Sequence, residues 1–312
     1  MALTTSNVKQ IAVSNFYEGL CSPSDSWRSI FRYSTENVAS LRIAALTGIP
    51  DPGAWTVSGD LPTATLDSTG AVTMAYSSYG VQVRISKLDA GGDVPGIVAM
   101  ASAKLGRAVA SKRAALAWAH LATAFTAGGT AIADTKALCA TDHPTIGTNR
   151  SNALTTALDR SAFLSAIAVL RGWRNYQNQQ YDLADAPKVL VVPPELEITA
   201  KQIIGSPFAM NSAVEAGSAS GVFKPPDAQG EANFAGRYST RVVVSPYLSD
   251  ASDWFVCVDP SVEAPLTFWD RSVPSFSGNV DEDSQAVKLN ADWSSATASG
   301  PQPDGIVGSS VS

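Results

Sequence analysis

Alternating apolar and polar residues mark the region before residue 87 as extended. From Tyr79 to Ile85 the odd positions are apolar, whereas the even positions carry Gly, Gln and Arg. This period of two is typical of a strand with one buried face. A second such stretch begins at Trp55, and the Asp-Ser-Thr-Gly sequence at 67–70 has the composition of a turn. A long hairpin is therefore predicted over residues 54–86. It carries too few apolar side chains to be stable alone, and we expect its faces to find no cover within their own chain and to lie on another copy.

A long helix is predicted directly after this hairpin. Asp93 is a suitable N-cap and Pro95 lies in the first turn. Twelve alanines, the best helix formers, occur between residues 94 and 127, and a Gly-Gly pair follows. A helix over 94–127 would be about 50 Å long.

The predicted helix has two faces of different character. Its apolar stripe consists of Ile97, Ala101, Leu105, Ala108, Ala115, Trp118 and Ala122. Lys104, Arg107 and Lys112 lie on another face, which is either solvated or contacts acidic neighbours or nucleic acid. Residues 80–126 hold six basic against two acidic side chains, whereas residues 250–312 hold ten acidic against two basic ones. This charge asymmetry also allows the basic face to pair with the acidic C-terminal region.

The remaining pattern mixes short helices and strands. Residues 1–50 are predicted as an extended arm with short helical pieces, including one or two turns between Val38 and Leu46. Segments rich in glycine and small polar residues, 205–238 and 294–312, are predicted to be flexible. Further helices are expected at 161–173 and 195–204, and further strands at 189–192, 241–245, 253–258, 264–269 and 285–289. The fold class that follows is α+β.

Composition excludes several classes of protein. The chain has 312 residues, of which 45% are hydrophobic and 16% are charged. A chain of this length buries a sufficient core without disulfides or metal, and its hydrophobicity excludes extensive disorder. No run of about 18 apolar residues is uninterrupted, which excludes a polytopic membrane protein. The net charge of −6 argues against a dedicated nucleic-acid-binding protein.

Candidates for chemistry are few. The three cysteines are odd in number and widely spaced, which fits a reducing compartment, and the N-terminus has no signal-peptide pattern. Neither GxxxxGK[ST] nor GxGxxG occurs. Cys139, Asp142 and His143 have the elements of an activated thiol or a metal site, but few further ligands exist. We predict no catalytic, cofactor-binding or metal residues, and interpret this segment as a turn that caps a loop.

The order of these elements carries a resemblance that no single motif carries. An arm, a long hairpin, a long helix, a mixed middle and returning strands resemble the major capsid proteins of tailed phages, which have the HK-97-like fold. Three stretches resemble the Mu-like major head subunit family in particular, namely ALCATDHP, VLVVPPELEITAKQIIGS and VVVSPYLSDASDWFVCVD. The resemblance spans about residues 50–290 and leaves the first 45 residues and the tail largely uncovered.

The resemblance implies a map of domains. The implied parts are an N-terminal arm (1–53), an E-loop hairpin that reaches over a neighbouring subunit (54–86), a peripheral domain (87–149) with its spine helix (94–127), an axial domain (150–250), strands that return to the peripheral sheet (251–293) and a flexible tail (294–312). The implied interface residues of the E-loop are Trp55, Asp67, Ser68, Thr69, Gly70, Tyr76 and Tyr79. This hairpin contains no lysine, so the lysine–asparagine cross-link of some relatives cannot form from it.

The function implied is that of a major capsid protein of the virion. Its copies would assemble as hexamers and pentamers, in the bacterial cytoplasm, into an icosahedral shell around double-stranded DNA. Scaffold, portal and decoration proteins would be further partners, without membrane contact, and Lys104, Arg107 and Lys112 would line the interior or a subunit interface. An encapsulin-like nanocompartment is the closest alternative. A soluble α/β hydrolase and a tail or decoration protein are alternatives of other classes.

Overall fold

The computed structural model describes residues 5–21, 25–46, 49, 68–86, 94–127, 132–181, 183–205, 235–238, 240–281, 286–299 and 302–311. Its helices are α1 (Thr5–Leu20), α2 (Val94–Ala122), α3 (Arg160–Arg171) and α4 (Glu197–Gly205), with 3-10 turns η1 (Asp25–Ser29), η2 (Pro194–Leu196) and η3 (Ala235–Tyr238). Its strands are β1 (Phe31–Thr35), β2 (Ser40–Leu46), β3 (Ser68–Ala75), β4 (Ser77–Ile85), β5 (Ala153–Leu154), β6 (Lys188–Val192), β7 (Thr240–Val244), β8 (Trp254–Val258), β9 (Leu266–Val280), β10 (Val287–Ser299) and β11 (Ile306–Ser309). No helix among these residues is long and apolar enough to cross a membrane.

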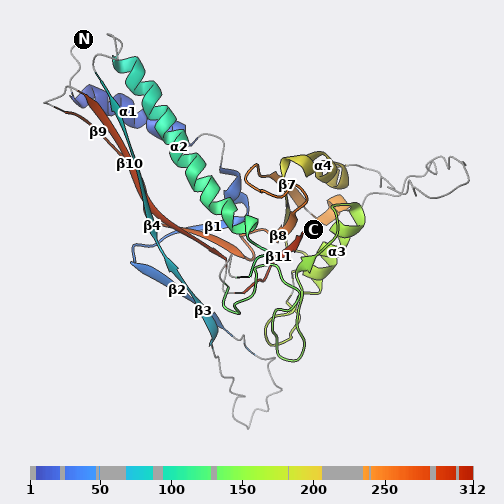
Figure 1. Cartoon of the computed structure of the whole chain (residues 1–312). Coiled ribbons are helices and arrows are strands. Elements are labelled where there is room, and N and C mark those ends of the chain that lie inside the picture. Colours follow the sequence, from blue (N-terminus) through green and yellow to red (C-terminus); the bar gives the residue numbers. More distant parts are fainter. Residues whose placement is uncertain are drawn as a thin grey trace, which may run out of the picture.

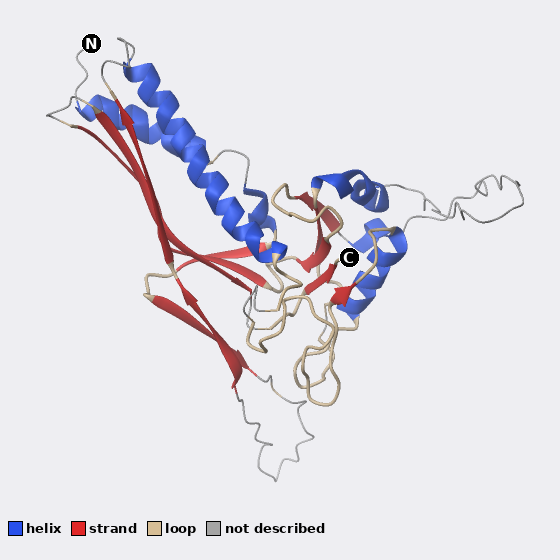
Figure 2. Ribbon diagram, in the orientation of Figure 1, coloured by secondary structure: helices blue, strands red, loops and turns tan. Residues whose placement is uncertain are grey.

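The described strands form three sheets (Figures 1 and 2). A four-stranded sheet has the order β1-β9-β10-β4, and a five-stranded sheet has the order β5-β11-β8-β6-β7. Strands β2 and β3 form a separate two-stranded ribbon. The long helix α2 runs beside the long strands and ends near the five-stranded sheet (Figure 1). This arrangement confirms the predicted α+β class.

Helices α1 and α2 cover one face of the long sheet. The buried side chains between them are Ala12, Phe16, Ile85, Val98, Leu105, Val109, Val287, Leu289, Ala291 and Trp293. The opposite face is polar, and there Gln82 Nε2 donates to Asn290 Oδ1 across the strands at 2.7 Å. The apolar face of β4 packs on this cluster through Tyr79, Val83 and Ile85, whereas Val81 is 40% exposed, so the predicted buried face is only partly covered.

A bulge interrupts the pairing of β9 with β10. Between the pairs Ser272–Ser294 and Ser275–Asp292, β9 has two residues where β10 has one. Pro274 is one of these two residues, and it has no N–H group to donate to the ladder. Bulges increase the local twist of a strand. Beyond this bulge β9 pairs with β1 in parallel, so its two halves lie in different surroundings.

Two glycines allow α1 and α2 to cross in close contact. A Cβ atom at Gly19 would lie 2.2 Å from the Ala103 carbonyl oxygen, and one at Gly106 would lie 2.2 Å from the Phe16 carbonyl oxygen. Both distances are shorter than a van der Waals contact, so only glycine fits at the crossing. The N-terminal segment is therefore a helix docked on α2, and the prediction of an extended arm is wrong for these residues.

We expect Gly106→Ala to destabilise the protein by about 1–3 kcal/mol, because the added methyl group overpacks the crossing and forces the helices apart. The measurement is the urea midpoint of the purified, unassembled chain. Gly205→Ala is the matched control, since a Cβ there has no atom within 4 Å. Equal losses in the two variants would contradict the tight crossing.

The five-stranded sheet is buried on both faces. All five residues of β6 and of β8 are buried, and successive side chains alternate between two core clusters. Val191 and Phe255 join the cluster that contains Trp118 of α2, whereas Leu190 and Trp254 join the cluster of α3 and α4. The prediction of a strand at 189–192 that is buried on both faces is confirmed.

The C-terminal segment is the largest correction to the predicted fold. The prediction of a flexible tail over 294–312 is wrong, because β10 extends to Ser299 and β11 lies buried between β5 and β8. Strand β8 also belongs to this five-stranded sheet and not to the long sheet of the returning strands. The small residues that resemble a linker serve close packing here. A Cβ at Gly308 would lie 2.7 Å from Cys139 Sγ and 2.8 Å from the rings of Phe125 and Phe255.

Several element boundaries also differ from the predictions. Helix α2 ends at Ala122 and not at residue 127, and 3-10-type bonds from Ala124 N–H and Thr126 N–H follow it. Ala108 and Ala122 of the predicted apolar stripe are exposed, because α2 packs on α1 along its first half and on the sheet cluster along its second. Residues 38–46 include strand β2 instead of helical turns. Most of the predicted loop at 205–238 lies outside the described residues.

Candidate assembly surfaces

The described part of the predicted hairpin pairs with other strands than predicted. Strand β2 pairs with β3 in antiparallel register, from Ser40 opposite Ala75 to Leu46 opposite Ser68. Ser68, Thr69 and Gly70 therefore lie within a strand, and the predicted turn at these residues is wrong. Trp55 and Asp67 lie outside the described residues. We call the pair β2–β3 the ribbon.

Strand β4 does not belong to the ribbon. It pairs with β10 along the long sheet, from Ile85 opposite Val287 to Ser77 opposite Ser295. The apolar positions are even up to Tyr76 and odd from Tyr79 on, so the break in phase at Ser77 and Ser78 marks this change of partner in the sequence. Of the predicted hairpin 54–86, residues 68–75 thus belong to the ribbon and residues 77–85 to the long sheet, whereas residues 54–67 lie outside the described residues.

The ribbon packs one of its faces on the same chain. Val72 and Met74 of β3 are buried against Trp269 and Ala296 of the long sheet. For the part of the ribbon that lies next to the long sheet, the prediction that it finds no cover within its own chain is therefore wrong. Its other face carries Arg42, Ala44, Leu46, Thr73 and Ala75, which are all exposed.

Tyr76 and Tyr79, both predicted as interface residues, make contacts within the chain. Tyr79 stacks on Trp293 with 5.2 Å between the ring centroids, and the Lys112 Nζ lies 5.7 Å from the Tyr79 centroid. Tyr76 packs against the cluster of Val72 and Trp269, and burial raises the pKa of its hydroxyl. Both rings are partly buried, so only part of each is left for another molecule.

The basic face of α2 is exposed. Lys104, Arg107 and Lys112 are solvent-exposed side chains on one side of the helix. Within the described part of the chain, no salt bridge joins Lys104 or Arg107 to a carboxylate. The expected pairing with the acidic C-terminal region is therefore not made by described residues of the same chain.

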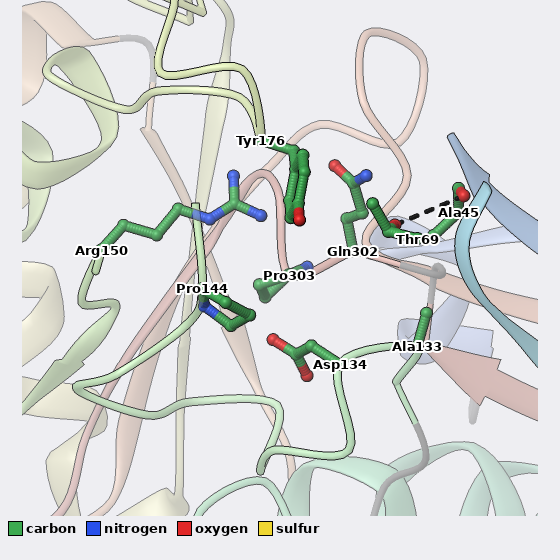
Figure 3. A pocket seen from close by; sticks show the side chains of 9 residues that line it. All are labelled: Ala45, Thr69, Ala133, Asp134, Pro144, Arg150, Tyr176, Gln302 and Pro303. Atoms are coloured by element: carbon green, nitrogen blue, oxygen red, sulfur yellow. Dashed lines mark hydrogen bonds between the residues drawn. The ribbon is translucent and has the colours of Figure 1, made fainter. Parts of the chain in front are cut away.

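A pocket lies at the root of the ribbon, where it meets the body. Its volume is about 270 Å³, and it is lined by Ala45, Thr69, Ala133, Asp134, Pro144, Arg150, Tyr176, Gln302 and Pro303. Figure 3 shows these side chains around the opening, with ribbon residues on one side and loop residues on the other. Gln302 Nε2 donates to the Leu46 carbonyl oxygen at 2.9 Å and ties the ribbon to the C-terminal segment.

The Cys139–His143 segment does not form a nucleophile site. Burial raises the pKa of the Cys139 thiol, so the reactive thiolate is disfavoured. His143 is completely buried and contacts Asp134 and Asn152, not the thiol. Asp142 pairs with Lys136. No group of three metal-ligating side chains occurs among the residues that the structure describes.

Sequence reasoning missed a buried ion pair at the junction of α2 and the long sheet. Arg113 pairs with Asp270, whose side chain has no exposed surface, and the Tyr33 hydroxyl donates to the same carboxylate at 2.8 Å. Burial raises the pKa of Asp270, whereas Arg113 and Tyr33 act to lower it. The only signal in the sequence was a charged residue directly after the apolar run Leu-Thr-Phe-Trp.

Comparison with solved structures shows the fold. The capsid of cyanophage P-SCSP1u is similar at 11% identity with a TM-score of 0.58, over 92% of this chain and 88% of that chain. The capsid of Ralstonia phage GP4 is similar at 11% identity with a TM-score of 0.57, over 90% and 87%. A virus-like particle from Pyrococcus furiosus is similar at 9% identity with a TM-score of 0.51, over 96% and 98%. No curated protein matches the chain.

Comparison with protein families shows the identity. A family model described as "Phage capsid protein" matches residues 71–307, which extend from β3 to β11 and make up most of the chain. The narrower resemblance to the Mu-like subfamily stays a prediction. The chain therefore belongs to the phage capsid protein family and is a major capsid protein with the HK-97-like fold.

Proposed function

We propose that copies of this chain assemble as hexamers and pentamers into an icosahedral shell that encloses double-stranded DNA. The observation that carries the proposal is the ribbon, which leaves the body with one face exposed (Figure 1). Heterologous contacts repeated around an axis close into rings. A projecting ribbon that lies on a neighbouring copy would make such a contact. It would also increase the interface area buried between the two copies.

The exposed ribbon face suits a close subunit contact. Ala44 lies opposite Ala71, and Arg42 lies opposite Thr73. The side chains on this face are small or polar, apart from that of Leu46, which is 48% exposed. A flat face of small side chains allows another backbone to approach closely, and the single leucine supplies an apolar anchor.

We expect the double substitution Ala44→Glu and Thr73→Glu to abolish shell formation while the chain still folds. Arg42 lies opposite position 73 and can pair with one of the two carboxylates, so the other one is left buried in the interface without a partner, which costs several kcal/mol. Electron microscopy of the purified protein is the measurement, and rings or shells are expected from the wild type. Ala44→Ser with Thr73→Ser is the matched control and is expected to assemble. Normal shells from the glutamate variant would exclude the ribbon face from the interface.

The basic face of α2 is proposed to face the packaged DNA or a neighbouring subunit. Three cations on one side of a helix attract phosphates without reading their sequence. The net charge of −6 keeps most of the surface from trapping DNA.

We expect the triple substitution of Lys104, Arg107 and Lys112 to glutamate to lower the yield of DNA-filled particles strongly, and the triple glutamine variant to lower it less. The reason is that reversal adds repulsion, whereas neutralisation only removes attraction. The ratio of filled to empty particles measures the effect. Lys201→Glu, on the exposed side of α4, serves as the control. An unchanged ratio in the glutamate variant would refute the role.

The chain is further proposed to act without catalysis, in the virion, after assembly in the host cytoplasm. Scaffold, portal and decoration proteins are proposed as further partners. An encapsulin-like shell is the second candidate, since the Pyrococcus furiosus particle has a similar fold. Nucleic acid in purified particles would favour the phage shell, and an enclosed protein cargo would favour the second candidate.

A further inference from the structure

A buried histidine lies beside the root of the ribbon. The His143 ring has no exposed surface. Its Nδ1 lies 2.7 Å from Asp134 Oδ2, and its Nε2 lies 3.0 Å from Asn152 Oδ1. The backbone of His143 also exchanges two hydrogen bonds with Arg150, at 3.0 and 2.9 Å. Three parts of the segment 132–152 therefore meet at one imidazole.

Asn152 can offer only its oxygen to the ring. Its Nδ2 donates to the carbonyl oxygens of Leu138 at 2.8 Å and of Ile306 at 3.1 Å. Its Oδ1 accepts from the Ala140 N–H at 2.8 Å. Turning the amide round would break all three bonds, so its orientation is determined by the network. The His143 Nε2 must therefore carry a hydrogen and donate it.

The Asp134 carboxylate likewise needs a hydrogen on the ring nitrogen that faces it, Nδ1. Its Oδ1 accepts from the Lys136 N–H at 3.0 Å, and its Oδ2 faces Nδ1. A proton is needed between Nδ1 and Oδ2 in addition to the proton on Nε2. A neutral imidazole that keeps its hydrogen on Nε2 would leave the buried Nδ1 and the partly buried Asp134 carboxylate facing each other as two acceptors, which is unfavourable.

The other charged groups around this ring are engaged elsewhere. Asp142, the residue before His143, pairs with Lys136. That bond is the main cause of a lowered pKa of Asp142, and His143 contributes. Arg150 pairs with Asp304 at 2.7 Å, and the Cys139 thiol on the same segment is buried. The contact with Asp134 is therefore the one that depends on a second proton.

The residue before Asp134 is where the ribbon touches this loop. Ala133 packs on the cluster that contains Val72 and Met74 of β3. A Cβ at Gly70 would lie 2.7 Å from the Ala133 carbonyl oxygen, so the two backbones are in direct contact. Asp134 also lines the pocket at the ribbon root (Figure 3). A shift of residues 133 and 134 would therefore move the surface against which the ribbon packs.

We propose that His143 is a proton-dependent latch for the ribbon. With both nitrogens protonated, the ring ties Asp134 to Asn152 and seats the ribbon root against the body. Loss of one proton, through the pocket beside Asp134, breaks the tie and loosens the root. The latch is closed while the ring donates to both Asp134 and Asn152, and it is open once one of these two donors is lost. This inference concerns one chain, so it does not depend on the proposed shell.

Nitrogen-15 NMR of histidine-labelled protein tests the protonation state. The chain has two histidines, and burial lowers the pKa of His120 to about 4, so His120 supplies a neutral reference at about pH 6. His143→Gln assigns the signals by removing one pair. We expect both His143 nitrogens to be protonated at about pH 6. A nitrogen without a proton at that pH would overturn the latch.

The variant Asp134→Asn keeps the contact between residue 134 and the His143 ring but removes its need for a second proton. An asparagine amide can donate to Nδ1 while Nε2–H still donates to Asn152, so a neutral ring satisfies both contacts. The measurement is the hydrogen-exchange protection factor of residues 68–75 and 132–136 in the unassembled chain. In the wild type we expect a fall of about five- to a hundredfold between about pH 5 and pH 8. In Asp134→Asn we expect no fall, and an equal fall in both proteins would overturn the proposal.

Discussion

Deletion of residues 303–312 is expected to leave no folded protein. Strand β11 lies between β5 and β8, so its removal unpairs both neighbours. Ile306 and Val307 are completely buried and belong to two different core clusters. Asp304 also accepts hydrogen bonds from Arg150 and from the Trp173 indole, each at 2.7 Å. These losses together approach the whole net stability of a typical domain, about 5–15 kcal/mol.

The measurement is the soluble yield and the thermal unfolding transition of the truncated chain. Deletion of Val311 and Ser312 alone is the control, because it keeps β11. Gly308→Val is a second test, since its side chain would overlap Cys139, Phe125 and Phe255 and should destabilise by several kcal/mol. Soluble, cooperatively folded protein after the longer deletion would show that the C-terminal segment is dispensable.

Asp270→Ala is expected to destabilise the protein by about 3–5 kcal/mol, because it leaves the Arg113 charge buried without its carboxylate. Arg113 is enclosed by aromatic rings, with its guanidinium 5.3 Å from Phe268 and 5.8 Å from Trp27. The Arg113 side chain is only 6% exposed, so water replaces little of the lost ion pair. The measurement is the free energy of unfolding of the unassembled chain in urea.

The double variant Arg113→Met with Asp270→Leu provides the matched control. Replacing both members of a buried ion pair by apolar side chains is often neutral, so most of the stability should return. Tyr33→Phe should cost about 1 kcal/mol, because it removes only the hydroxyl that donates to Asp270. If the double variant is as unstable as Asp270→Ala, the loss comes from packing and not from an unpaired charge.

The candidate surfaces were only partly predictable. Lys104, Arg107 and Lys112 are exposed on α2 as expected, because helical periodicity relates positions within one element. The ribbon residues were assigned to a hairpin with the wrong strands. A period of two records that a strand has one buried face, but it does not record which strand lies beside it. The pairing of β4 with β10 depends on contacts between residues more than 200 positions apart.

The sequence carried even less signal for the buried polar contacts. Arg113, Asp270, Asp134 and Asn152 are separated in the sequence, and each is an ordinary polar residue there. They form two separate contacts, the Arg113–Asp270 ion pair and the hydrogen bonds of Asp134 and Asn152 to His143, only when the fold brings the partners together in the interior, where an unpaired polar group is costly.

The sequence by itself determined the α+β class, the long alanine-rich helix, the buried strand at 189–192 and the helix at 161–173, because these follow from local periodicity and composition. Only the tertiary structure decided that α1 docks on α2, that the ribbon root packs on its own chain, and that the glycine- and serine-rich C-terminus is a central strand. The physical reason is that small residues are favoured both in flexible linkers and in tightly packed sheets. Which of the two applies depends on whether Cys139, Phe125 and Phe255 converge on Gly308, and that convergence is a property of the whole fold.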